Sequence, residues 1–201
     1  MKNILSIACA IFCLFSLESQ AQSSVGLSYF GESIINPGMK ATYEYSLWSK
    51  RKSKPRWLFN RNDKLGTKVK TQETFVTGNL GFYNVANSHS AILLISEFGY
   101  RRTKHRKGSF LETSLGLGYQ QRIYNIDTYQ LGIGTEPDKL EAAGQAQFLT
   151  TLSFGFGRNL GYRRNIPLSW FVKPTLMLAM PQAHTAVPSA ALEIGLRYFI
   201  K

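Results

Sequence analysis

The chain has 201 residues, including 17 glycines, 13 phenylalanines, 10 tyrosines and 3 tryptophans, and its formal net charge is +12. Its length fits one domain. Beyond residue 21, no apolar run approaches the ~20 residues of a membrane helix, and no cysteine remains to form a disulfide or bind a metal. These features argue against a helical membrane protein and a disulfide-stapled scaffold.

The first 21 residues have the pattern of a secretory signal peptide. Lys2 supplies a positive n-region, residues 4–17 form a short apolar core, and Ser19-Gln20-Ala21 offers a small-x-small cleavage site. A lipoprotein signal ending at Cys9 is disfavoured, because only about five apolar residues would precede the cysteine. Residues 1–21 are therefore predicted to be removed, which leaves residues 22–201 as the domain.

Alternation with a period of two predicts eight strands after the signal. The clearest is 108–124, where Leu111, Leu115 and Leu117 share one face, while Glu112 and small residues share the other. An apolar face opposite a small, polar face is typical of a transmembrane strand between lipid and a polar lumen. The predicted strands are 23–31, 38–48, 68–83, 90–101, 108–124, 145–157, 168–180 and 189–201.

The predicted fold class is all-β, an eight-stranded antiparallel up-and-down transmembrane β-barrel. Ten strands would require an extra hairpin within 49–67 or 125–144, where no strong alternation occurs. Pro174 cannot donate a ladder hydrogen bond, so it predicts a bulge or a local opening. A soluble lipocalin-like barrel is disfavoured, since its water-facing surface would carry more mixed charge than these glycine- and alanine-rich faces do.

The strand count also predicts an orientation. An even number of strands puts both chain ends on one side, which in bacterial barrels is the periplasm. The connections 32–37, 84–89, 125–144 and 181–188 would then face outward, and 49–67, 102–107 and 158–167 would face the periplasm. The loop 125–144 is long enough to suggest a functional or mobile segment.

Charged residues fall on the predicted inner faces of the strands, where they would fill the narrow lumen with a polar network. Lys40 and Arg101 are expected near the ends of this interior. The predicted network consists of Glu44, Glu73, Glu97, Glu112, Glu193, Lys173 and Arg197. An ion pathway or an acid–base site is the alternative, although eight strands leave little room for it.

Cations gather at the predicted periplasmic end. They would form a solvated collar against anionic head groups, or dock an acidic periplasmic partner or a cell-wall polymer. Nucleic acid is not expected as a partner of a secreted chain. The predicted basic turns contain Lys50, Arg51, Lys52, Lys54, Arg56, Arg101, Arg102, Lys104, Arg106, Lys107, Arg163 and Arg164.

Catalysis has little support in the sequence. His89 and His184 fall in predicted outer loops, where Asp127 or Glu136 could approach them, and a Ser-His-acid site at the rim would need such a cluster. No local motif marks one. No catalytic residue, metal site or cofactor is predicted.

At the level of pattern, the chain resembles the small outer-membrane β-barrel proteins of the OmpA/OmpX type, and it is similar to uncharacterised barrels of Bacteroidota. The resemblance rests on Phe110 to Tyr119, Leu168 to Met180 and the final strand from Leu192 to Lys201. It implies residence in the outer membrane of a Gram-negative bacterium and insertion by the machinery that reads an aromatic C-terminal strand. The ending Phe199-Ile200-Lys201 departs from a terminal aromatic.

Two classes of function remain open. The first is a barrel with a structural or interaction role in the cell envelope, its lumen plugged by the charged network. The second is an outer-membrane enzyme that modifies lipid, and a narrow pore is a weaker third reading.

Overall fold

The computed structural model describes residues 22–32, 36–54, 68–86, 88–105, 107–124, 128–130, 138–140, 144–161, 166–181 and 186–200. The predicted signal peptide, residues 1–21, lies outside this part of the chain. Within these ranges, no helix is long and apolar enough to cross a membrane.

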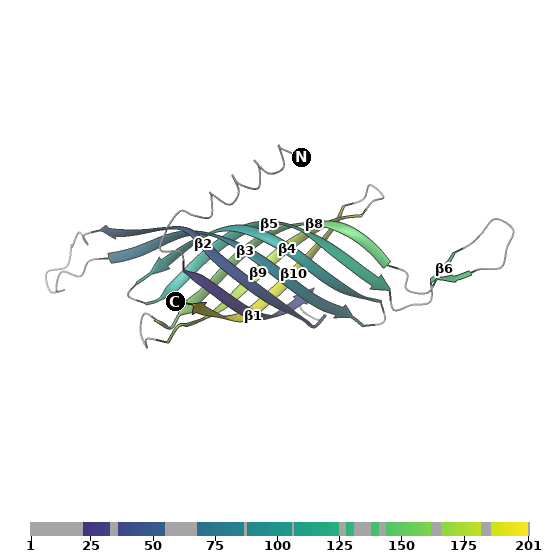
Figure 1. The fold of residues 1–201 in the computed structure, drawn as a ribbon, viewed down its shortest axis with the longest axis horizontal. Helices are drawn as coiled ribbons and strands as arrows, with labels where there is room; N and C mark the ends of the chain where they lie inside the picture. The colour runs from purple at the N-terminus through teal and green to yellow at the C-terminus, as the bar shows by residue number, and fades with distance from the viewer. Residues whose placement is uncertain are drawn as a thin grey trace, which may run out of the picture.

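Eight long antiparallel strands form a closed ring in the order β1-β10-β9-β8-β5-β4-β3-β2 (Figure 1). The first and last strands close it, with Ser23 opposite Ile200 and Glu32 opposite Ala191. The ring strands are β1 (Ser23–Glu32), β2 (Gly38–Lys54), β3 (Lys68–Val85), β4 (His89–Lys104), β5 (Ser109–Tyr124), β8 (Gly144–Asn159), β9 (Leu168–Pro181) and β10 (Val187–Ile200).

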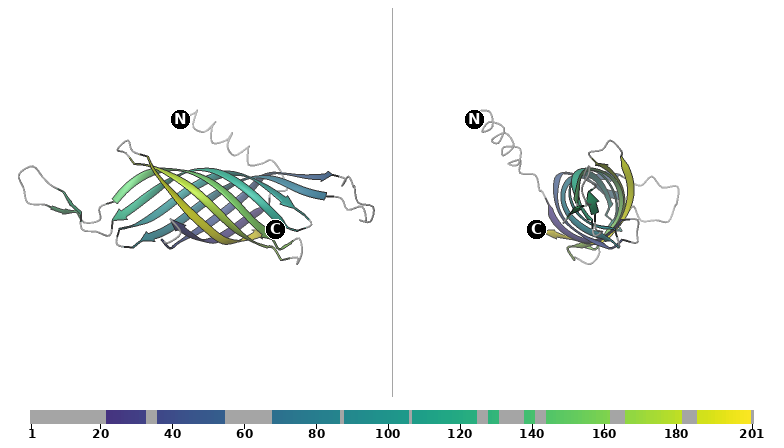
Figure 2. Two further views of the ribbon diagram at one scale, coloured as in Figure 1. Left: turned by 180° about the vertical axis from the view of Figure 1, so that it is seen from behind. Right: turned by 90° about the vertical axis from the view of Figure 1, so that its right-hand side faces the viewer.

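The predicted eight-stranded barrel is therefore confirmed. Within the predicted loop 125–144, two short strands, β6 (Thr128–Gln130) and β7 (Asp138–Leu140), pair with each other and stay outside the ring. The end-on view in Figure 2 shows the ring closed around a narrow interior.

Several strands extend beyond their predicted ends. β2 and β3 continue to pair as far as Lys54 opposite Lys68, beyond a bulge between Ser46 and Trp48. The basic residues Lys50, Arg51, Lys52 and Lys54 thus belong to β2, and Arg101, Arg102 and Lys104 belong to β4, rather than to turns. Apolar alternation marks only the apolar part of a strand, whereas backbone pairing continues past it.

The barrel is apolar outside and polar inside. Leu111, Leu117 and Phe148 are 65%, 71% and 75% exposed, whereas Glu97, Glu193 and Ser153 are buried inside the ring. An exposed apolar surface of this extent needs lipid as its solvent, and closure leaves no unpaired strand edge in that solvent. The fold is a transmembrane β-barrel.

The interior is layered along the barrel axis. Near the end that holds the β3–β4 turn, apolar side chains form a buried cluster: Phe30, Tyr83, Ala91, Leu93, Ile95, Leu149, Met177, Ala179 and Ala191. Beyond this cluster the interior side chains are mainly polar and charged.

Pro174 produces a local opening. Pairing between β8 and β9 stops after Ser153 opposite Thr175 and resumes in the same register at Phe156 opposite Val172. A proline lacks the N–H that the ladder would use there.

Closure predicts heat modifiability in detergent. Because each ring strand is paired on both sides, the barrel should resist detergent at room temperature and unfold only on heating. Unboiled and boiled samples should therefore migrate differently on a detergent gel. Identical migration of the two samples would argue against a closed barrel.

Candidate functional site: the charged lumen

Arg101 lies at the centre of an ionic cluster toward the end of the barrel that holds the β4–β5 turn. Its Nη1 and Nη2 donate to Glu44 Oε1 and Oε2 at 2.8 and 2.5 Å, and its Nε donates to Glu112 Oε2 at 2.8 Å. Glu73 Oε2 lies 3.4 Å from Nη1. This fork geometry satisfies two carboxylates at once, which suits a planar guanidinium and would not suit a lysine.

Arg197 completes this cluster from β10. Its Nη1 and Nη2 donate to the two oxygens of Glu112 at 3.2 and 3.3 Å, and its Nε lies 3.4 Å from Glu44 Oε2. The two guanidiniums also lie over aromatic rings, with Arg101 4.4 Å from the Phe75 centroid and Arg197 4.9 Å from that of Phe171. Each cation is thus held by carboxylates at its edges and by a ring at its face.

A second cluster lies between these arginines and the apolar layer. Lys173 Nζ donates to Glu97 Oε2 at 2.5 Å, and Lys40 Nζ lies 2.5 Å from Glu193 Oε2 and 3.9 Å from Glu97 Oε1. Ser114 and Ser28 donate hydroxyl hydrogen bonds to Glu97 and Glu193 at 2.9 and 2.8 Å. Two cations therefore neutralise two carboxylates in the buried interior.

The structure brings all seven residues of the predicted network into the interior, together with Lys40 and Arg101, which were expected near its ends. Arg101 was assigned to a basic turn, yet its side chain is 4% exposed inside the ring. Glu193 forms an ion pair with Lys40. Lys40 lies on β2 and Glu193 lies on β10, with β1 between them. On β1, the small residue Ser28 lies opposite both Lys40 and Gly195, which leaves room for the side chains of Lys40 and Glu193 to meet.

Glycines provide the room for these long side chains. A Cβ on Gly155 would lie 2.5 Å from Glu112 Cγ, and one on Gly99 would lie 2.3 Å from Phe75 Cζ. The inward small residues of the sequence are therefore the positions against which the large charged and aromatic groups pack.

The predicted basic turns are only partly described. Lys50, Arg51 and Lys52 are exposed on the β2 extension, and Lys107 is exposed in the β4–β5 turn. Arg102 and Lys104 are exposed on β4. The positions Arg56, Arg106, Arg163 and Arg164 lie outside the described residues.

His105 connects this basic end to the barrel. Its Nε2 lies 2.7 Å from Thr71 Oγ1, and its backbone N–H donates to the Val69 carbonyl at 3.2 Å. Burial, and then the charge of Arg51, lower the pKa of His105 below its usual value. The imidazole is accordingly neutral at pH 7, and the positive charge here comes from lysines and arginines.

At the opposite mouth, His89 begins β4. Its Nδ1 lies 2.9 Å from Ser88 Oγ, and its ring packs edge-on against Tyr83 and Tyr124. His184, Asp127 and Glu136 lie outside the described residues. In the described part of the chain, no group of three or more His, Cys, Asp or Glu side chains is placed to hold a metal ion.

Solved structures similar to this chain are β-barrels. The N-terminal β-barrel domain of Pseudomonas aeruginosa OprF matches at 14% identity over 89% of this chain and 100% of that one, with a TM-score of 0.45. The Yersinia pestis outer membrane protein Ail matches at 9% identity over 90% and 100%, with a TM-score of 0.42. The outer membrane enzyme PagL matches at 10% identity over 88% and 98%, with a TM-score of 0.40.

No protein-family model matches the chain, and no curated protein is significantly similar to it in sequence. The chain is similar in fold to these proteins, as expected, while the barrel itself is established by its own strand pairing. These structural similarities do not indicate a function for this chain.

The ionic cluster predicts a large stability difference between two glutamates that contact the same arginine. Replacing the buried Glu112 by leucine would leave Arg101 and Arg197 partly uncompensated, and should cost about 3–5 kcal/mol. Glu73, whose side chain is 21% exposed, is the matched control, and Glu73→Leu should cost about 1 kcal/mol or less. Urea unfolding in detergent measures the stability lost in each variant. Equal losses would contradict the stronger pairing of Glu112 with the two arginines.

Proposed function

We propose that the protein is an outer-membrane β-barrel with a structural or interaction role in the envelope of a Gram-negative bacterium, and that its lumen is sealed. The observation that carries this proposal is the interior itself. Five of the carboxylates in the described interior face four cations within hydrogen-bonding or ion-pairing distance, and the apolar layer lies beyond them. Side chains that are paired in this way stabilise the barrel and do not provide a path for a solute.

The orientation of the barrel follows from the same proposal. Ser23 pairs with Ile200, so both ends of the ring lie on one side, together with the β2–β3, β4–β5 and β8–β9 connections. With those ends in the periplasm, the basic extension of β2 faces the periplasmic leaflet. The β6–β7 hairpin then faces the cell exterior.

A lipid-modifying enzyme is the second candidate, and the contact between Ser88 and His89 favours it. A serine hydroxyl beside an imidazole is the first element of a nucleophilic site. The pair consists of neighbours at the β3–β4 turn, and two tyrosine rings hold the imidazole. An altered acyl pattern of lipid A in a deletion strain, reproduced by Ser88→Ala or His89→Ala, would support the enzyme over the structural role.

Conductance tests the sealed lumen. The purified barrel in planar bilayers should show no stable single-channel steps, because the ionic clusters and the apolar layer occupy the interior. A double Glu112→Ala, Arg101→Ala variant leaves the second ionic cluster and the apolar layer in place, so it should also show no stable steps. Reproducible channel steps from the native protein would overturn the sealed lumen and favour the narrow pore.

A further inference from the structure

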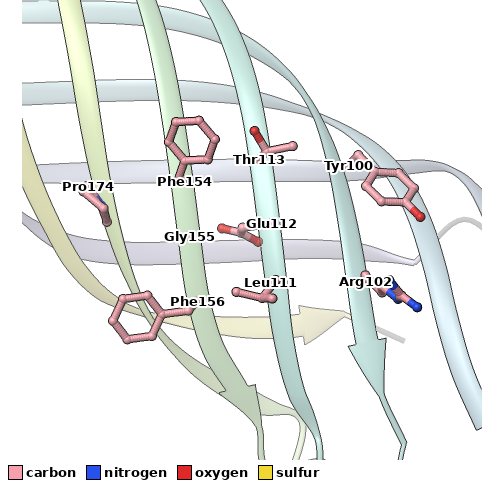
Figure 3. A pocket seen from close by; sticks show the side chains of 9 residues that line it. All are labelled: Tyr100, Arg102, Leu111, Glu112, Thr113, Phe154, Gly155, Phe156 and Pro174. Atoms are coloured by element: carbon pink, nitrogen blue, oxygen red, sulfur yellow. The ribbon is translucent and has the colours of Figure 1, made fainter. Parts of the chain in front are cut away.

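A depression of about 390 Å³ indents the outer wall of the barrel. It crosses four strands, from Tyr100 and Arg102 on β4 to Pro174 on β9, and Figure 3 shows these two sides with Leu111, Phe154 and Phe156 between them. These three apolar side chains are about half or more exposed. The depression thus presents a recessed apolar surface to lipid, with one cation at its margin.

The opening at Pro174 explains where the depression lies. Phe154 and Gly155 face Pro174 and Lys173 at the interrupted part of the β8–β9 ladder. Gly155 adds no side chain to the wall, while Glu112 at the floor turns inward to Arg101 and Arg197. The only carboxylate lining the depression is therefore neutralised from the other side of the sheet.

Cations continue the wall beyond Arg102. Arg102 lies opposite Gln72, and Gln72 lies opposite Lys50, so Arg102 and Lys50 are two strand spacings, about 10 Å, apart. One step further along the strands, Lys104 lies opposite Lys70, and Lys70 lies opposite Lys52. Arg102, Lys104, Lys50 and Lys52 thus give this part of the outer wall a positive charge, which attracts an anion.

Aromatic residues on the same face indicate how deep in the membrane these cations lie. On the same outward face, Thr74 lies between Trp48 and Tyr100, and the two aromatic side chains are 51% and 37% exposed. Exposed Trp and Tyr mark the interface between hydrocarbon and head groups. The paired residues that include Arg102 and Lys104 follow Tyr100 along the strands. They therefore lie at the level of lipid phosphates.

We propose that this part of the wall binds one anionic glycerophospholipid, with its phosphate at Arg102 and Lys50 and an acyl chain in the depression between Leu111 and Pro174. The proposal rests on the membrane residence proposed above. Charge complementarity identifies the head group, and the recessed apolar wall beside it identifies the chain. Binding would fix one lipid against β4, β5, β8 and β9 instead of leaving a diffuse anionic shell.

Native mass spectrometry of the folded barrel tests the site. The protein in detergent is titrated with phosphatidylglycerol or with phosphatidylcholine that carries the same acyl chains. Phosphatidylglycerol should be retained with a stoichiometry of one, and more strongly than phosphatidylcholine. Arg102→Gln should weaken its retention about fivefold, the factor that corresponds to about 1 kcal/mol per cation near an anionic surface.

Matched variants separate a site from general charge. Lys107→Gln removes the same charge from the exposed β4–β5 turn and should leave retention unchanged. Thr113→Trp fills the depression and should abolish retention, whereas Thr150→Trp, on the outward face of β8 away from the depression, should not.

Equal losses from Arg102→Gln and Lys107→Gln, or equal retention of the two lipids, would overturn the proposal. Each variant is first checked for the heat-dependent gel shift. If Arg102→Gln does not fold, Lys50→Gln replaces it and should weaken retention in the same way, whereas Arg102→Lys keeps the charge and should retain phosphatidylglycerol. A native chain found only in the soluble fraction would refute the proposed membrane residence itself, which is a different failure from a folded barrel that retains no lipid.

Discussion

The interior of an eight-stranded ring holds side chains and little water, so each charge within it must be neutralised by another side chain. This constraint explains why the inward carboxylates are spread over β2, β3, β4, β5 and β10, and why several of their partners come from strands that are not neighbours in the ring. Arg101 joins β4 to β2 and β5, and Arg197 joins β10 to the same two strands. Such contacts hold the wall together across the lumen, in addition to the backbone pairing around it.

Glycines on the inner face leave the room that these contacts need. Gly155 leaves room for Glu112, and Gly99 leaves room for the Phe75 ring, which in turn lies over Arg101. Ring, guanidinium and carboxylates thus form one packed unit, so that a larger residue at either glycine would displace an ionic contact. On the outer surface, the opening at Pro174 leaves the recess that we propose for a lipid chain.

Much of the barrel could be predicted from the sequence, because a period of two assigns each side chain to one face of its strand. That period placed Glu112 and Lys173 inside and Leu117 outside. It could not place Lys50 and Arg102 on strands, because the apolar alternation ends before these residues while the backbone pairing continues past them. Nor could it pair Lys40 with Glu193, because that contact depends on the register of β1 with both neighbours, and the register reflects ring closure rather than any local pattern.

A double-mutant cycle on Lys173 and Glu97 tests the mutual neutralisation of lumen charges most directly. These side chains are buried and lie 2.5 Å apart. Lys173→Met and Glu97→Leu should each destabilise the barrel in urea unfolding, and the double variant should be more stable than the sum of the two losses by about 1–3 kcal/mol. A coupling energy near zero in folded variants would show that the two charges do not depend on each other, and would contradict the account.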